Sequence, residues 1–80
     1  PYREEVFVAP VDFLIQSDRR NEAYDLLVEA LRVNPNSIGI RKMYCLLCLE
    51  MGYDAFAETS LETLSQIMPP APYQAFLGVY

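Results

Sequence analysis

NEAYDLLVEALRVNPNS, residues 21–37, has the clearest structural pattern in this 80-residue chain. Apolar side chains recur in it at helical spacing, at Ala23, Leu26, Leu27, Ala30 and Leu31. Asn34-Pro35-Asn36 then has the composition of a turn, because proline fixes φ and asparagine tolerates tight turns. The pattern predicts a helix over residues 22–33 that begins after Asn21 as its cap and ends at this turn.

The same pattern returns 34 positions further along the chain. Four pairs of residues share this offset: Ala23 and Ala57, Leu27 and Leu61, Ala30 and Leu64, and Pro35 and Pro69. A fixed period of this length, with two helices in each unit, is typical of helical-repeat proteins. The sequence therefore predicts two units of similar structure.

Two further helices are expected in the second unit. Ser37 is expected to cap a helix over residues 38–51, which Gly52 ends because glycine adopts a left-handed conformation at little cost. Asp54 is expected to cap the next helix, over residues 55–68.

The two ends of the chain give weaker patterns. Pro10 cannot donate a backbone hydrogen bond, so we expect a main helix over residues 10–17 with a looser segment before it. The alternation of Val6 and Val8 leaves a short strand as an alternative for that segment. Residues 73–80 are expected to add one or two turns of helix.

These elements predict an all-α fold of about five helices in a single domain spanning residues 1–80. The first unit would span residues 4–37 and the second residues 38–71. Residues 72–80 would begin either a terminal helix or a truncated third unit. Two units alone give a marginal core, because repeat arrays need about three units to bury a continuous one.

The period, the helix pairs and the Asn-Pro-Asn turn together resemble the tetratricopeptide repeat. Ala23, Leu27, Ala30 and Pro35 match the small, bulky, small and proline positions of that family, and Gly52-Tyr53 matches its glycine and aromatic pair. Pro10 and Arg41 depart from the family pattern in the first helix of each unit. The resemblance implies a right-handed stack of antiparallel helix hairpins, a fold that serves protein binding.

In the family that this chain resembles, the first helices of successive units line a concave groove. The resemblance places seven residues there: Val8, Asp12, Ile15, Lys42, Met43, Leu46 and Leu49. The helix over residues 38–51 is apolar nearly all round, so every side of it needs to be covered. Either the rest of the chain covers it, with residues 73–80 taking part, or a partner segment does.

The composition argues against binding to nucleic acid and against a membrane-spanning helix. The net charge is −5, there is no histidine, and no basic run is longer than two residues. A surface of this kind is unsuited to nucleic acid, whose phosphates require a basic patch. No apolar run approaches the roughly 18 residues of a membrane-spanning helix.

Cys45-x-x-Cys48 is the one motif that suggests chemistry. Zinc needs four ligands, and a redox pair usually lies at a helix N-terminus, whereas these two thiols fall inside a predicted helix. We therefore expect both cysteines to be reduced thiols that serve packing, and reduced thiols favour the cytoplasm as the compartment. Asp54, Glu58 and Glu62 have no partner base, so a solvated face is expected. No catalytic residues, metal or cofactor are predicted.

The function predicted is that of a protein-interaction module, such as a scaffold or a chaperone-like adaptor. It would hold a protein or peptide segment, apolar or helical, in the groove. The alternative is a structural role, either as a spacer segment of a larger protein or as a module that self-associates into a homo-oligomer.

Overall fold

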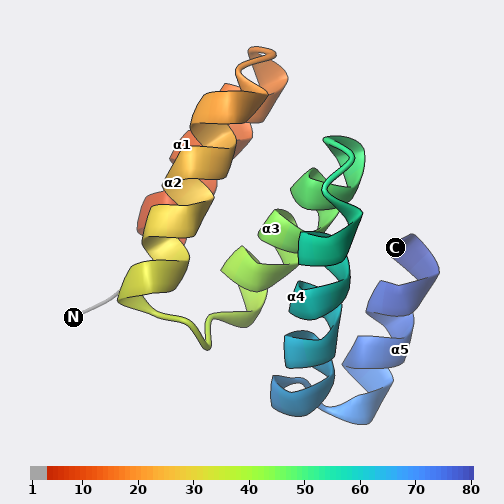
Figure 1. Cartoon of the computed structure of the whole chain (residues 1–80). Coiled ribbons are helices and arrows are strands. Elements are labelled where there is room, and N and C mark those ends of the chain that lie inside the picture. Colours follow the sequence, from red (N-terminus) through yellow and green to blue (C-terminus); the bar gives the residue numbers. More distant parts are fainter. Residues whose placement is uncertain (1–3) are drawn as a thin grey trace.

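The computed structural model describes residues 4–80, which form five α-helices and no strand. The helices are α1 (Glu5–Gln16), α2 (Arg20–Val33), α3 (Ile38–Glu50), α4 (Asp54–Ile67) and α5 (Pro70–Val79) (Figure 1). The prediction of an all-α fold with about five helices is confirmed. The alternative of a strand at Val6 and Val8 is wrong, since both residues lie in α1.

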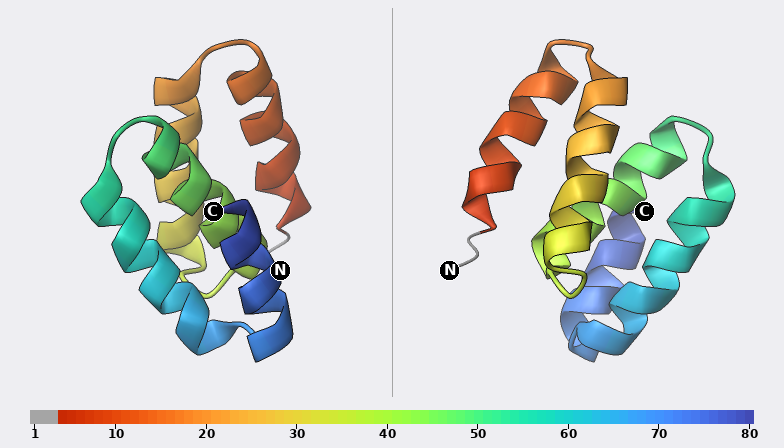
Figure 2. Two further views of the ribbon diagram at one scale, coloured as in Figure 1. Left: turned by 90° about the vertical axis from the view of Figure 1, so that its right-hand side faces the viewer. Right: turned by 60° about the vertical axis from the view of Figure 1, so that its left-hand side comes forward.

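Each helix packs on the next one in the chain. The pairs α1–α2 and α3–α4 are antiparallel hairpins, and α2 lies between α1 and α3 in the right-hand view of Figure 2. The helix α1 also contacts α3, and α5 packs on α4. The result is a slab measuring 33 × 32 × 18 Å.

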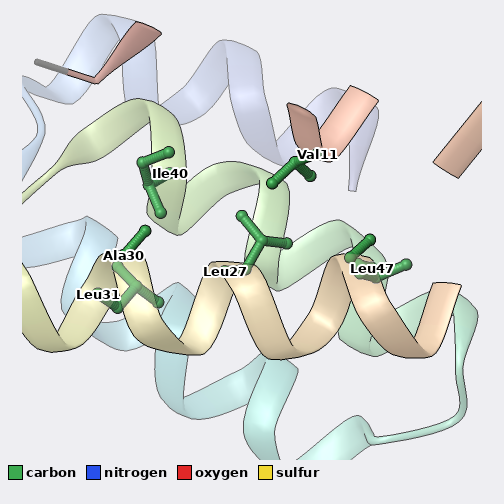
Figure 3. Packing of buried hydrophobic residues seen from close by; sticks show 7 residues of the cluster. Val11, Leu27, Ala30, Leu31, Ile40 and Leu47 are labelled. Atoms are coloured by element: carbon green, nitrogen blue, oxygen red, sulfur yellow. The ribbon is translucent and has the colours of Figure 1, made fainter. Parts of the chain in front are cut away.

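The first core cluster joins α1, α2 and α3. Its buried members are Val11, Ala23, Leu27, Ala30, Leu31, Ile40 and Leu47. Figure 3 shows side chains of α2 meeting Val11 of α1 and Ile40 and Leu47 of α3. The repeated apolar positions of α2 therefore face the core, as helical periodicity requires.

The second core cluster joins α3, α4 and α5. Its buried members are Cys45, Cys48, Ala57, Leu64, Met68 and Phe76. Because α3 contributes to both clusters, none of its residues from 38 to 48 is exposed. The chain itself, with α5 taking part, thus supplies much of the cover that this apolar helix needs.

The turns within the two hairpins have the same backbone geometry. Asp18 has φ 59° and Gly52 has φ 81°, and these residues are 34 positions apart. In both turns the next amide donates over 2.8 Å to the carbonyl five residues earlier, from Arg19 to Leu14 and from Tyr53 to Cys48. The left-handed residue predicted at Gly52 is confirmed, and Asp18 takes the same conformation although it carries a side chain.

The helix predicted to begin at Pro10 begins at Glu5 instead, with Pro10 inside it. Proline there leaves the carbonyl of Val6 without an amide donor. Val6 and Pro10 lie on an exposed face of α1, where water can solvate that carbonyl. Solvation explains how the helix continues through a residue that was expected to start it.

Two predicted caps are wrong and one is confirmed. The helix α2 begins before Asn21, and Asp54 is the first residue of α4 rather than its cap. The left-handed residues reverse the chain so sharply that each helix starts two residues later, without a side-chain cap. Ser37 does cap α3, since its Oγ accepts a hydrogen bond from the amide of Ile40 at 3.4 Å.

The last helix, α5, begins at Pro70, three residues before the start expected at Tyr73. Prolines in the first turn of a helix cost little, because the amides of that turn have no partner within the helix. Pro70 therefore starts α5, directly after α4 has ended before Pro69.

Candidate functional site

The seven residues predicted to line a groove lie on two helices that contact each other. Val8, Asp12 and Ile15 are on α1, and Lys42, Met43, Leu46 and Leu49 are on α3. Val8, Ile15 and Met43 are half-buried and pack against the first core cluster. We call these three residues, which the contacting helices α1 and α3 bring to the first core cluster, the α1–α3 surface.

The other four predicted residues lie in different settings. Asp12 is exposed, and Leu49 is 37% exposed and belongs to neither core cluster. Leu46 packs against the second cluster instead of the first. The Nζ atom of Lys42 lies 6.0 Å from the centroid of the Phe76 ring, so α5 partly covers it.

A carboxylate links the beginning of α1 to the beginning of α3. Glu4 accepts a hydrogen bond from the hydroxyl of Ser37 at 2.8 Å and from the amide of Ile40 at 3.1 Å. Its negative charge also suits a helix N-terminus, where the macrodipole is positive. A Cβ on Gly39 would clash with the carboxylate of Glu4, so glycine leaves the room for this contact. The contact fixes the two helices relative to each other at one end of the α1–α3 surface.

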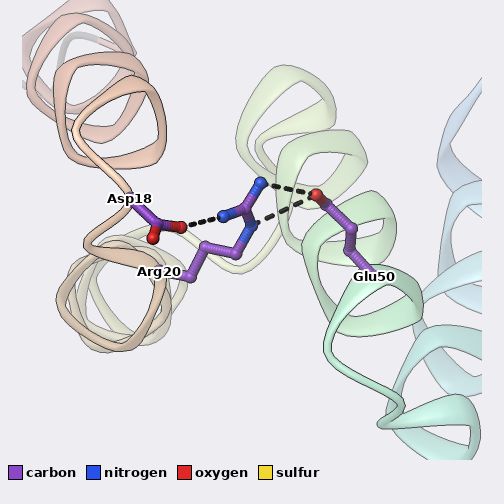
Figure 4. Close-up of polar contacts among 3 residues, drawn as sticks. All are labelled: Asp18, Arg20 and Glu50. Carbon is purple, nitrogen blue, oxygen red and sulfur yellow. Dashed lines mark hydrogen bonds and ion pairs between the residues drawn. The ribbon is translucent and has the colours of Figure 1, made fainter.

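An ion pair joins the two hairpins at the end near their turns. Arg20 of α2 donates from Nε and Nη2 to one oxygen of Glu50 on α3, over 3.1 and 2.8 Å (Figure 4). Its Nη1 donates to Asp18 at 2.5 Å. The side chain of Glu50 is about half exposed, so solvent screens this link and its contribution is small.

Four aromatic side chains form a row that the sequence did not predict. Tyr24 lies between Tyr44 and Tyr53, with ring centroids 5.6 and 5.4 Å away, and Phe56 lies 6.2 Å beyond Tyr53. Tyr53 and Phe56 are 41% and 55% exposed. The residues come from three helices and a turn, so no local periodicity predicts the row. Burial is the main reason that the pKa of Tyr44 is raised.

The two cysteines lie within the second core cluster and are fully buried. The thiol of Cys45 donates to the carbonyl of Ala57 at 3.3 Å. Burial raises the pKa of Cys45 to about 11, and it raises the pKa of Cys48 as well. Neutral, shielded thiols are poor nucleophiles, so both residues act in packing, as the sequence predicted.

No pocket and no cluster of three metal-binding side chains occurs among residues 4–80. Over the same part of the chain, every helix is too short or too polar to cross a membrane. The α1–α3 surface is therefore an open face rather than a cavity. What it offers a ligand is half-buried apolar side chains on two helices that also carry Asp12 and Lys42.

Comparison of this chain with protein-family models, curated proteins and solved structures finds no match.

Proposed function

We propose that this chain is a tetratricopeptide-like interaction module that holds a segment of a partner protein along the α1–α3 surface. The observation that carries the proposal is that Val8 and Ile15 of α1 and Met43 of α3 all pack, half-buried, against the same core cluster, although they come from two helices. Half-exposed apolar side chains gain most from a ligand, because they are already held in place and still have area to bury.

Three structural features support a repeat of two similar hairpins. The turns share their left-handed residue and their hydrogen bonds at a spacing of 34 residues. The equivalent alanines, Ala23 and Ala57, are both fully buried. The contact between α1 and α3 places the first helices of the two hairpins side by side, as a shared binding face requires.

The ligand expected on this surface is an apolar or amphipathic segment. At about 25 cal/mol per Å² of apolar area, covering a few such side chains supplies several kcal/mol, part of which offsets the entropy lost on association. The carboxylate of Asp12 and the ammonium of Lys42 favour a segment with complementary charges at its two sides.

Peptides selected against the chain from a random phage-displayed library test this function. Leu49→Glu places a charge at a residue predicted to line the groove and is expected to weaken binding of the selected peptides about tenfold or more. Val28→Glu is the matched control, since Val28 is 42% exposed on α2 and belongs to neither core cluster. Equal losses in both variants, with both still folded, would contradict a site on this surface.

A structural role is the second candidate function, and the exposed apolar residues of α1 favour it. Four exposed apolar residues form one stripe along α1, at the helical spacing of i, i+3, i+4 and i+7: Val6, Ala9, Pro10 and Phe13. We call this set the α1 stripe. Val6 is 63% exposed and Phe13 is 61% exposed, and the stripe contains no charge. An apolar face of this kind is characteristic of a surface that another helix covers.

A further inference from the structure

The α1 stripe corresponds, 34 positions on, to residues of α3 that are covered. Ile40 stands where α1 has Val6, and Leu47 stands where α1 has Phe13. Ile40 is 0% exposed and Leu47 is 2% exposed. The same two positions are therefore buried in the second hairpin and open in the first.

The cover over those positions in α3 includes α2. Leu27, Ala30 and Leu31 of α2 share the first core cluster with Ile40 and Leu47 (Figure 3). These residues combine small and bulky side chains, so the two helices approach closely and interdigitate. No helix among residues 4–80 covers the α1 stripe in this way.

We infer that the α1 stripe is the docking face for one more helix, the second helix of a further hairpin of the same kind, stacked on α1 as α2 is stacked on α3. This inference rests on the repeat arrangement proposed above. The occupant is an amphipathic helix with small and branched apolar residues along one face. Basic side chains beside that face are expected, because the charged residues of α1 are Glu5 and Asp12 alone.

A second copy of this chain fits the stripe less well, for two reasons. Head-to-tail stacking would use α4 of the copy, but α5 already packs on α4 through Leu64, Met68 and Phe76. Symmetric stacking of stripe on stripe would bring the carboxylates of two acidic helices together in a chain of net charge −5.

A tandem duplication tests the inference. Residues 4–37 are inserted a second time directly before Glu4, so that the added copy of α2 precedes the original α1 in the 34-residue register. The duplicated chain is expected to unfold at a higher urea concentration than the parent chain. A duplicated chain that is no more stable than the parent would overturn the inference.

Phe13→Glu, made separately in each copy of α1, supplies the matched control. In the duplicated chain, Phe13→Glu in the internal copy of α1 is expected to lower the folding equilibrium constant about 100-fold or more, because the carboxylate would be buried. Phe13→Glu in the terminal copy is expected to change it less than about fivefold, since that stripe stays in water. Equal effects in the two copies would contradict docking on the stripe.

The parent chain gives an independent check that does not depend on the duplication. Phe13→Glu in the parent is expected to leave the protein folded and monomeric by circular dichroism and sedimentation equilibrium. Loss of folding would show that the stripe is already covered. A parent dimer that Phe13→Glu dissociates would identify a second copy as the occupant and overturn the inference. Peptide binding to the α1–α3 surface is measured separately, so either proposal can fail alone.

Discussion

The helices α1 and α3 begin the two hairpins, end in turns of the same geometry, and differ sharply in how they are covered. The residues of α3 from 38 to 48 are all buried or half-buried. In α1 only Val11 is buried, and a whole apolar stripe faces water. The sequence of each helix sets its local geometry, but the neighbours available to it set its burial.

The two helices should therefore contribute unequally to stability. The helix α3 contacts α1, α2 and α4 and shares the second core cluster with Phe76 of α5. The helix α1 packs on α2 and touches α3, and Pro10 removes one of its backbone hydrogen bonds. We expect α3 to be the stable centre of the molecule and α1 to be its weakest element apart from the chain ends.

The largest difference is expected for truncation at Leu47 and Phe13, which are 34 positions apart. Leu47→Ala should cost about 3 kcal/mol of unfolding free energy, because it leaves a cavity in the first core cluster. Phe13→Ala should cost less than about 1 kcal/mol, although it removes a larger side chain. Urea unfolding followed by circular dichroism measures both. A Phe13→Ala cost equal to that of Leu47→Ala would contradict the unequal cover.

Alkaline pH should distinguish the two helices at another pair that is 34 positions apart, Val11 and Cys45, both of which are fully buried. Burial raises the pKa of Cys45 from 9.0 to about 11, so the unfolded chain loses this proton first as the pH rises. The contribution of Cys45 to stability is therefore complete below pH 9 and is lost between pH 9 and pH 11.

The variant Cys45→Val copies the residue of α1 into α3 and checks this expectation. Its unfolding free energy, measured in urea from pH 8 to pH 11, should fall less steeply than that of the parent chain. Cys48 is also buried with a raised pKa, so some alkaline loss should remain. Identical slopes in the two proteins would show that the Cys45 thiol does not titrate differently on folding.

Substitutions at the two left-handed turn residues should differ less in their effect on stability. Gly52→Ala should destabilise the protein by about 1 kcal/mol, because a Cβ is disfavoured at φ 81°. Asp18→Gly should be neutral or stabilise by up to about 0.5 kcal/mol, since it relieves the same conformation at φ 59° and the exposed pair with Arg20 that it removes contributes little. Thermal unfolding measures both variants. A stabilising Gly52→Ala would show that this turn is not held in the left-handed region.

The smallest effect is expected at the link between the hairpins. Arg20→Ala should cost about 0.5 kcal/mol, because the pair with Glu50 is partly exposed and screened by salt. The double-mutant cycle with Glu50→Ala isolates the interaction itself. Its coupling energy should shrink as sodium chloride is added. A salt-independent coupling would mean that water does not reach the pair.

Much of the fold could be predicted from short-range patterns. The periodicity of residues 22–33 identified the helix that carries the core positions Ala23, Leu27 and Ala30, and Ser37 and Gly52 marked the ends of α3. These features depend on a few neighbouring residues, so the sequence carries them directly.

The features that were missed depend on residues distant in the sequence or on solvent. The helix α1 continues through Pro10 where the carbonyl of Val6 is open to water, and the exposure of that face is set by tertiary neighbours. The row of Tyr24, Tyr44 and Tyr53 forms only when three parts of the chain meet. Leu46 was placed with Met43 by the resemblance, and the structure packs it against the second core cluster.

Native-state amide hydrogen exchange measures the difference between the covered helix α3 and the open helix α1 without any substitution. The amides of α3 should exchange about as slowly as global unfolding allows, and those of α1 at least about tenfold faster. Mass spectrometry of peptic fragments resolves the two helices. Equal protection of α1 and α3 would contradict the account, because it would mean that the first helix is held as firmly as the second despite its open stripe.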